Sequence, residues 1–300
     1  MVTDETSATG DAVPRGVGAT ALGVTRLRAI ESNRARPLAI DPYAERILEA
    51  AVPAGSEWTA DRGAAEPRFF RLMRDQVAVR TRFIDDTIAR AVADGAAQVV
   101  VLGCGMDTRS YRLNWPEGVH VFDLDLPEVL AFRDAVLSRL AASGGHRTSV
   151  AADLREDWPR SLVAAGFDPT VRTLWVCEGL LYALPATAAE DLLTEITLLS
   201  SPASAVVVDH ITDSPAFAAA REEVSPELLE LWQGGPEHVG TWLSGHGWEP
   251  DVRDLRNEAA RYGREIPEDL AGGQHEVART WLAVGELAST NPGVSGRRWG

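Results

Sequence analysis

After Gly95, short runs of β-forming residues alternate with segments of helical character. The runs cover residues 98–102, 119–124, 148–152, 173–177 and 205–209. Alternation of this kind is typical of βαβ units, in which parallel strands form one sheet with helices on both faces. Two further candidate strands, 248–252 and 280–284, complete a set of seven. The sequence therefore predicts an α/β fold with a doubly wound, mostly parallel, seven-stranded sheet.

Three other segments lie outside this alternation. Residues 1–19 carry no hydrophobic periodicity and predict a mobile tail, whereas residues 20–95 have a helical pattern interrupted by prolines. A longer helical insertion spans about 213–243. Because no linker-like stretch divides the chain after the tail, we expect a single domain over 20–300, with an N-terminal helical extension and a helical lid insertion.

Charge and cysteine content exclude several classes of partner. The 300 residues include 29 Lys and Arg against 44 Asp and Glu, which gives a net charge of −15. This balance argues against binding to a nucleic-acid backbone or an anionic membrane, since both require positive charge. The two cysteines, Cys104 and Cys177, are too few for a disulfide framework. With no targeting segment or membrane span in the pattern, we expect a cytoplasmic protein, and the oligomeric state is left open.

The strongest local signal is the run from Val99 to Leu102, which leads directly into Gly103-Cys104-Gly105. Two glycines at the end of a buried strand let a ligand approach the backbone closely. About twenty residues later a second strand ends at Asp125. A carboxylate in this place can accept hydrogen bonds from both hydroxyls of a ribose. The spacing predicts a nucleoside site.

The residues after the glycines distinguish two classes of cofactor. Dinucleotide sites usually have a third glycine at the position of Thr108, where a helix N-terminus meets the pyrophosphate. Here Asp107 precedes Thr108, and its carboxylate would repel a pyrophosphate but not a ligand with sulfonium and ammonium groups. The pattern favours S-adenosylmethionine over a nicotinamide dinucleotide.

Other strands also end in acidic residues. Asp123 is a second candidate for the ribose, Asp153 could accept from an adenine amine while the Leu154 backbone donates to the ring, and Glu178 follows the fourth strand. Singly, each acid is explained as a solvated loop residue or a helix cap. Together they predict a site, because the carboxyl ends of parallel strands meet at one edge of a sheet.

Arg80 interrupts the apolar stripe of a predicted helix, between Val77 and Ile84. A buried guanidinium requires a carboxylate, because an unpaired buried charge costs several kcal/mol. Two interpretations stay open: an internal ion pair with an acid such as Asp107 or Glu178, or a bidentate contact with the carboxylate of the cofactor's methionine moiety.

Several segments resemble one known family. They are TALG (20–23), DPYA (41–44), VRTRFIDD (79–86), VLGCGMDTRSYRL (101–113), DLDLPEV (123–129), ADLR (152–155) and CEGLL (177–181). On these segments the chain resembles the leucine carboxyl methyltransferase-like family of S-adenosylmethionine-dependent methyltransferases, which includes polyketide carboxyl O-methyltransferases and many actinobacterial members. The resemblance implies a class I methyltransferase fold of Rossmann-like type.

The resemblance also implies roles for single residues. Arg80 would bind the cofactor carboxylate, Gly103, within the Gly103-x-Gly105 turn, the amino-acid moiety, and Glu178 the amino end. Asp125 would bind the ribose, with Asp153 and Leu154 on the adenine. A basic residue from the N-terminal helix is expected as well, with Arg28 and Arg34 as candidates. The chain departs from the family at Tyr182, because members commonly carry the tyrosine one residue later, where Ala183 stands.

The acceptor is expected to be a small-molecule carboxylic acid or phenol, with a place in secondary metabolism. A carboxylate is already ionised, so Arg109, Tyr111 and His210 could simply hold it, whereas a phenol would need a general base, for which His210 is the first candidate. Four of the other five histidines lack ligand spacing, and no metal site is predicted; they are His146, His238, His246 and His275. Four tryptophans, Trp58, Trp232, Trp242 and Trp248, are expected in the core, or in a lid with an aromatic lining.

Two alternatives remain at this stage. One is a nicotinamide-dependent oxidoreductase, and the other is a noncatalytic binding module on a methyltransferase fold. Titration with the methyl donor distinguishes the first from a methyltransferase, and turnover assays distinguish the second.

Overall fold

A computed structural model describes residues 17–52, 66–138, 146–212, 215–222, 232–266 and 280–288. Most of the expected tail (1–16), Trp58 and part of the predicted lid insertion lie outside the described residues. The last three residues of that expected tail, 17–19, belong to a helix instead. None of the helices in the described ranges combines the length and the apolar character needed to cross a membrane.

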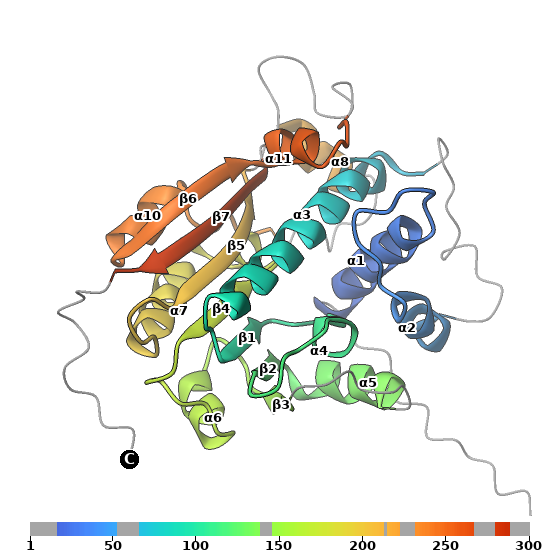
Figure 1. Ribbon diagram of the computed structural model, residues 1–300. Coiled ribbons are helices and arrows are strands. Elements are labelled where there is room, and N and C mark those ends of the chain that lie inside the picture. Colours follow the sequence, from blue (N-terminus) through green and yellow to red (C-terminus); the bar gives the residue numbers. More distant parts are fainter. Residues whose placement is uncertain are drawn as a thin grey trace, which may run out of the picture.

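One seven-stranded sheet forms the centre of the fold, in the order β3-β2-β1-β4-β5-β7-β6 (Figure 1). Its strands are β1 (Gln98–Leu102), β2 (His120–Asp125), β3 (His146–Ala151), β4 (Thr173–Cys177), β5 (Ala205–Ile211), β6 (Trp248–Asp254) and β7 (Thr280–Leu287). The first five pair in parallel, and β7 lies antiparallel between β5 and β6. The predicted mostly parallel sheet of seven strands is confirmed.

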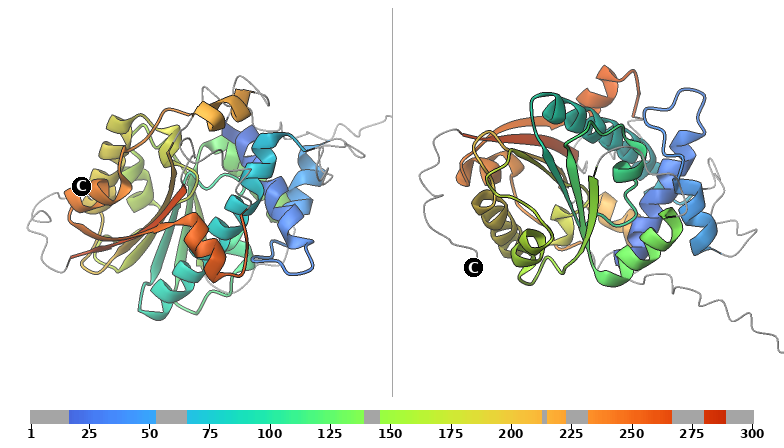
Figure 2. Two further views of the ribbon diagram at one scale, coloured as in Figure 1. Left: turned by 90° about the horizontal axis from the view of Figure 1, so that it is seen from above. Right: turned by 60° about the horizontal axis from the view of Figure 1, so that its bottom comes forward.

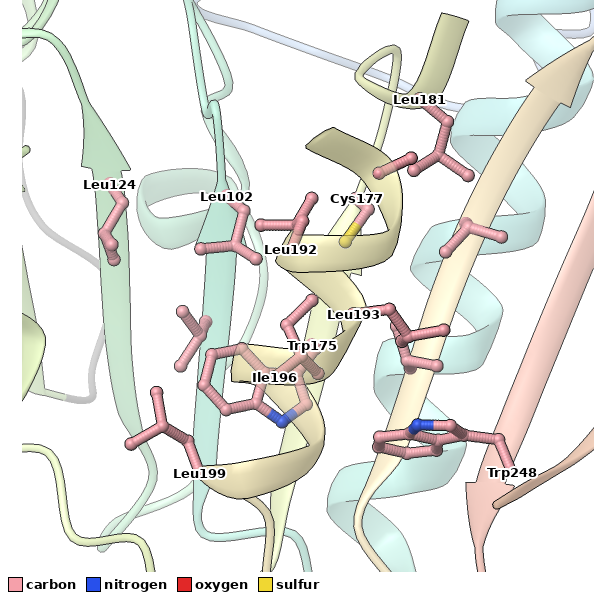
Figure 3. Packing of buried hydrophobic residues seen from close by; sticks show 14 of the residues in the cluster. Leu102, Leu124, Trp175, Cys177, Leu181, Leu192, Leu193, Ile196, Leu199 and Trp248 are labelled. Atoms are coloured by element: carbon pink, nitrogen blue, oxygen red, sulfur yellow. The ribbon is translucent and has the colours of Figure 1, made fainter. Parts of the chain in front are cut away.

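Helices cover both faces of this sheet. One face packs against α6 (Trp158–Ala164), α7 (Ala186–Leu198) and α10 (Val239–Gly245), and the other against α3 (Arg68–Ala93) and α11 (Leu255–Arg261). Figure 3 shows how α7 sets Leu192, Leu193 and Ile196 against Trp175. Burying each such leucine or isoleucine contributes roughly 1.5–3 kcal/mol. The central strands β1, β4 and β5 are buried along their whole length, as expected for parallel strands covered on both faces.

The N-terminal extension is helical, as predicted. It comprises α1 (Val17–Ser32), α2 (Ala44–Ala51) and α3, with α1 packed against both others beside the sheet (Figure 2). The remaining elements are α4 (Arg109–Arg112), α5 (Pro127–Leu137), η3 (Leu181–Ala183) and α8 (Pro215–Glu222). Parallel strands leave their carboxyl ends on one edge, so the turn after β1, the end of β2 and the turn after β4 meet there.

Candidate functional site

The glycine turn after β1 has the backbone shape that the sequence predicts. Gly103 and Gly105 have φ values of +59° and +51°, a left-handed conformation that favours glycine. A Cβ on Gly103 would lie 3.3 Å from Leu180 Cδ1 and 3.9 Å from Leu154 Cδ1. Two leucine side chains thus stand over a bare backbone. A side chain at position 103 would therefore push against Leu180, and glycine is the residue that fits.

Asp125 closes the turn from the neighbouring strand. Its Oδ2 accepts from Gly105 N at 2.6 Å and its Oδ1 accepts from Leu126 N at 2.7 Å. Burial raises the pKa of this carboxyl, and the two backbone donors oppose that rise. Each oxygen keeps a lone pair beyond these bonds, so Asp125 fits two ribose hydroxyls.

Asp123 does not fit the ribose role that we considered for it. The side chain is completely buried, accepts from Ser110 Oγ at 2.6 Å and pairs with Arg133 at 3.2 Å. Burial raises the pKa of Asp123, and the charge of Arg133 lowers it. This residue is an internal counter-charge, which leaves Asp125 as the candidate.

Beside the glycine turn lies a group of eight charged side chains, which we call the buried ion-pair cluster. Each member forms at least one ion pair with another member, with a nitrogen–oxygen distance of 2.9 Å or less. Arg28 and Asp107 form one additional, longer pair at 3.9 Å. The members are Arg28, Arg80, Arg109, Arg112, Asp85, Asp107, Glu178 and Asp209.

Arg80 links two acids of this cluster, Glu178 and Asp209. Its side chain is 3% exposed, its Nε lies 2.9 Å from Glu178 Oε1, and its Nη1 donates to Asp209 Oδ2 at 2.9 Å. The second oxygen of Asp209 accepts from Gly179 N at 2.6 Å. The internal ion pair that the sequence allowed is therefore present with Glu178, and Asp209 takes the place of the other suggested partner, Asp107.

Glu178 receives three guanidinium groups. Arg28 donates to Oε1 at 2.8 Å, Arg80 contacts the same oxygen, and Arg109 donates to Oε2. Burial alone would raise the pKa of this carboxyl, but the charges of Arg109, Arg28 and Arg80 outweigh it and hold the pKa well below its usual range. Glu178 is thus ionised at neutral pH, the state required to bind an ammonium group.

Arg28 reaches the cluster from α1, whereas Arg34 does not. Arg34 lies near the end of this helix, 38% exposed, and pairs with Glu31 and Asp75. The same helix covers the glycine turn, because a Cβ on Gly105 would lie only 3.0 Å from Ala21 Cβ. Of the two basic candidates in the N-terminal helix, the structure brings Arg28 to the site.

Asp153 and Leu154 follow β3 in the predicted order. Leu154 stands over Gly103, and Asp153 accepts from Arg155 Nη2 at 2.6 Å. That arginine is 76% exposed, so its ion pair is weak and can yield to a ligand.

The geometry does not support Arg109 and Tyr111 as holders of the acceptor. Arg109 is 1% exposed, and its guanidinium is taken by Asp85, Asp107 and Glu178. Tyr111 packs in an apolar group beneath α1 and α2, with its hydroxyl against Asp134 and Arg147. Sequence neighbours thus separate, because the one-turn helix α4 points their side chains to different places.

His210 is 2% exposed at the end of β5. Burial lowers its pKa, the nearby charge of Asp209 opposes that change, and Nδ1 has no hydrogen-bond partner among the described residues. The loop at Gly235 covers the ring, since a Cβ there would lie 3.1 Å from His210 Cε1. The imidazole is therefore neutral and covered.

Sequence reasoning missed two carboxylates of the cluster. Asp209 accepts from Arg80 and Gly179, and Asp85 pairs with Arg109 and Arg112. Asp209 had a usable signal, because it is one more acid near the end of a predicted strand. Asp85 lies on the helix of Arg80 and within the segment 79–86 that carries the family resemblance, but its spacing does not show that it reaches Arg109.

Comparison with known proteins agrees with this geometry. The chain is 39% identical over 297 residues to a protein of Mycobacterium tuberculosis (strain ATCC 25177 / H37Ra). The aligned region covers 93% of this chain and 94% of the relative. It is 43% identical over 267 residues to a protein of Frankia alni, covering 87% of this chain and 94% of that one. Both relatives bear the provisional name of S-adenosyl-L-methionine-dependent methyltransferase.

A crystal structure of a provisionally named methyltransferase from Thermobifida fusca has the same fold. It aligns with a TM-score of 0.53 at 14% identity, and covers 89% of this chain and 94% of its own. A model of the leucine carboxyl methyltransferase family matches residues 21–197, more than half of the chain. The oxidoreductase alternative is thereby excluded. The chain belongs to the leucine carboxyl methyltransferase family and is an S-adenosylmethionine-dependent methyltransferase.

Proposed function

We propose that this enzyme methylates an oxygen atom of a small molecule in secondary metabolism, and that the oxygen belongs to a carboxylate. The observation that carries the proposal is the state of His210. It is the histidine that the sequence placed at the strand ends, and it is neutral, buried and covered by the loop at Gly235. A carboxylate needs no base, whereas a hydroxyl acceptor would need His210 to be uncovered. A hydroxyl is therefore the second candidate.

The cofactor would lie across the strand ends. Asp125 would bind the ribose, the backbone at Gly103 the amino-acid moiety, and Leu154 with Asp153 the adenine. When bound, S-adenosylmethionine supplies a methyl group that its sulfonium already activates. Arg80 would bind the carboxylate end and Glu178 the ammonium end, each giving up part of its pairing within the buried ion-pair cluster.

The apolar surroundings of Arg80 support an apolar acceptor. Met73 and Val77 on α3, Tyr182 and Ile211 form a separate apolar group, with Trp232 packed against it. On this proposal the apolar group would exclude water from the methyl group, and an in-line transfer further requires the acceptor oxygen to lie about 3 Å from the methyl carbon. Trp242, on α10, and Trp248, on β6, are buried in the core instead, so Trp232 is the one candidate for the lid among the described residues.

The test is a methyl-transfer assay with labelled S-adenosylmethionine and a panel of aromatic and aliphatic acids, matched with the corresponding phenols and alcohols. We expect acids to be methylated, with kcat/KM constant between about pH 6 and 9, because their carboxylates stay ionised throughout. His210→Gln should leave this rate within about twofold. Turnover of phenols alone, with a rate that rises with pH and is lost in His210→Gln, would overturn the proposal.

A further inference from the structure

Tyr182, the tyrosine that stands one residue earlier than the family pattern, joins two parts of the site. Its ring stacks on Trp232, with the ring centroids 4.0 Å apart and the planes at 7°. Its hydroxyl lies beside the Arg80 guanidinium: a Cβ on Gly179 would be 3.2 Å from that oxygen and 3.7 Å from Arg80 Nη1. The side chain is 6% exposed. A single buried residue thus touches both the loop at 232–235 and Arg80 of the cluster.

The loop at 232–235 is fixed to the backbone around Tyr182. Gln233 N and Gly234 N donate to Tyr182 O at 2.8 and 3.2 Å, and Gly235 N donates to Leu184 O at 2.9 Å. On α8, Arg221 lies over the Trp232 ring, 4.4 Å from its centroid. The indole is held in a layered stack between Tyr182 and this guanidinium, and in turn restricts the rotation of the tyrosine ring.

The direction of the Arg80 fork depends on its neighbours. Asp209 accepts a hydrogen bond from Nη1, Glu178 lies 2.9 Å from Nε without forming a hydrogen bond to it, and the Tyr182 hydroxyl lies on the side of Gly179. Burial raises the pKa of Tyr182 to about 12, against the opposing charge of Arg80, so the hydroxyl is neutral. A neutral hydroxyl can position a guanidinium without competing with a ligand carboxylate for its charge.

We infer that Tyr182 is a positioning residue, which orients Arg80 toward the carboxylate of the cofactor and is itself oriented by Trp232. The inference rests on the proposed role of Arg80. It makes the loop at 232–235 a determinant of cofactor affinity, although that loop need not touch the cofactor. The shifted tyrosine acquires a function different from lining the acceptor site.

Two ligands separate this role from a general structural one. S-adenosylhomocysteine carries the amino-acid end, whereas 5′-methylthioadenosine has the same nucleoside and sulfur without it. In calorimetric titrations of Tyr182→Phe we expect the Kd of S-adenosylhomocysteine to rise about three- to tenfold. The Kd of 5′-methylthioadenosine should stay within about twofold. Tyr262→Phe is the matched control, because that hydroxyl bonds Asp86 at 3.1 Å on the outer side of α3.

Trp232 provides the second arm. Trp232→Leu should raise the Kd of S-adenosylhomocysteine by a similar factor, whereas Trp232→Phe should leave the affinity close to that of the unaltered protein. The double variant Tyr182→Phe/Trp232→Leu should bind S-adenosylhomocysteine no more weakly than the worse of the two single variants. Equal weakening of both ligands, or additive effects in the double variant, would overturn the inference. Failure of Arg80→Met to weaken S-adenosylhomocysteine would instead refute the proposed function of Arg80 itself.

Discussion

Arg80 shows how one buried charge organises the site. It interrupts the apolar stripe of α3, and its guanidinium faces Glu178 and Asp209. Replacing half of a buried ion pair is costly, typically about 3–5 kcal/mol, since the partner charge is left alone. Arg80 therefore contributes both to stability and to the proposed grip on the cofactor.

Arg80→Met should lower the affinity for S-adenosylhomocysteine by about thirtyfold or more, because a bidentate charged contact is lost. The affinity for 5′-methylthioadenosine should hardly change. Calorimetry on protein shown to be folded by circular dichroism measures both. Arg82→Met is the control, since Arg82 is 45% exposed and pairs with Asp86 in the same helix. Equal effects of the two variants would contradict the assignment.

Asp123 and Asp125, both on β2, should differ in function: Asp125 in cofactor binding and Asp123 in stability. Asp125→Asn is expected to weaken S-adenosylhomocysteine about tenfold with a modest loss of stability, because the amide oxygen can keep one backbone bond. Asp123→Asn should do the reverse, lowering the melting temperature with little effect on affinity, because Arg133 loses its buried counter-charge. Thermal unfolding and calorimetry on both variants check this. Loss of affinity in Asp123→Asn alone would assign the ribose to that residue.

The sequence predicted the acids at the strand ends and the buried guanidinium, but not the way they pair. Periodicity shows that Arg80 is buried because burial follows from local spacing. Its partner Asp209 lies 129 residues away, and their approach depends on the β4–β5 pairing. The geometry gives no support to an acceptor-binding role for Arg109 and Tyr111, and the sequence could not show this, because adjacency says nothing about which way each side chain of a one-turn helix points.

At the scale of elements, the loop at 232–235 is the segment whose fit depends most on a single residue. Gly235 has φ +68°, and a Cβ there would lie 2.5 Å from Leu181 O. Nothing in this arrangement can relax without moving either the loop or the turn after β4, because the obstacle is backbone.

Gly235→Ala should destabilise the protein by about 1–2 kcal/mol of backbone strain plus about 1–3 kcal/mol of overlap. Gly263→Ala is a close control, because Gly263 has φ +67° and open space around it, so that it incurs only the strain. Chemical denaturation of the two variants gives the difference. Equal destabilisation would mean that the loop moves aside freely.

Prediction of whole elements succeeded where burial is uniform. The short apolar runs gave the observed bounds of β1 and β4 and the start of β5, because both faces of these strands are covered. Strand β5 continues two residues past its expected end, to Ile211. The edge strand β3 begins two residues before its expected start, at His146, where polar side chains conceal the strand pattern. The position of β7 between β5 and β6 was beyond prediction, because strand order depends on contacts remote in sequence.

At the scale of the whole molecule, low pH should lower the stability of the fold more than high salt concentration does. The guanidinium groups hold the pKa values of Glu178 and Asp85 below their usual range despite burial. A lowered pKa in the folded state contributes stability above the unfolded pKa, near 4, which is lost as the pH falls further. Burial raises the pKa values of Asp123 and Asp125. Protonation of these two carboxyls therefore stabilises the folded state slightly as the pH falls toward 4, which opposes the loss from Glu178 and Asp85.

The melting temperature should therefore be nearly constant from about pH 7 to 5 and fall steeply below about pH 4. Circular dichroism across this range measures it. Because the cluster is buried, about 0.5 M NaCl should not change the pH range in which the melting temperature falls steeply. A loss of stability that begins near pH 6 would point instead to histidines.

The cluster holds equal numbers of positive and negative groups, four of each. On the proposed assignment, the amino-acid end of the cofactor enters as a zwitterion, so it leaves the sum of charges unaltered. The incoming ammonium would replace a guanidinium at Glu178, and the incoming carboxylate would replace a carboxylate at Arg80. Binding is then an exchange of ion-pair partners. Such an exchange disfavours any nucleoside that carries just one of the two charges, because a desolvated ion would then lack its counter-ion.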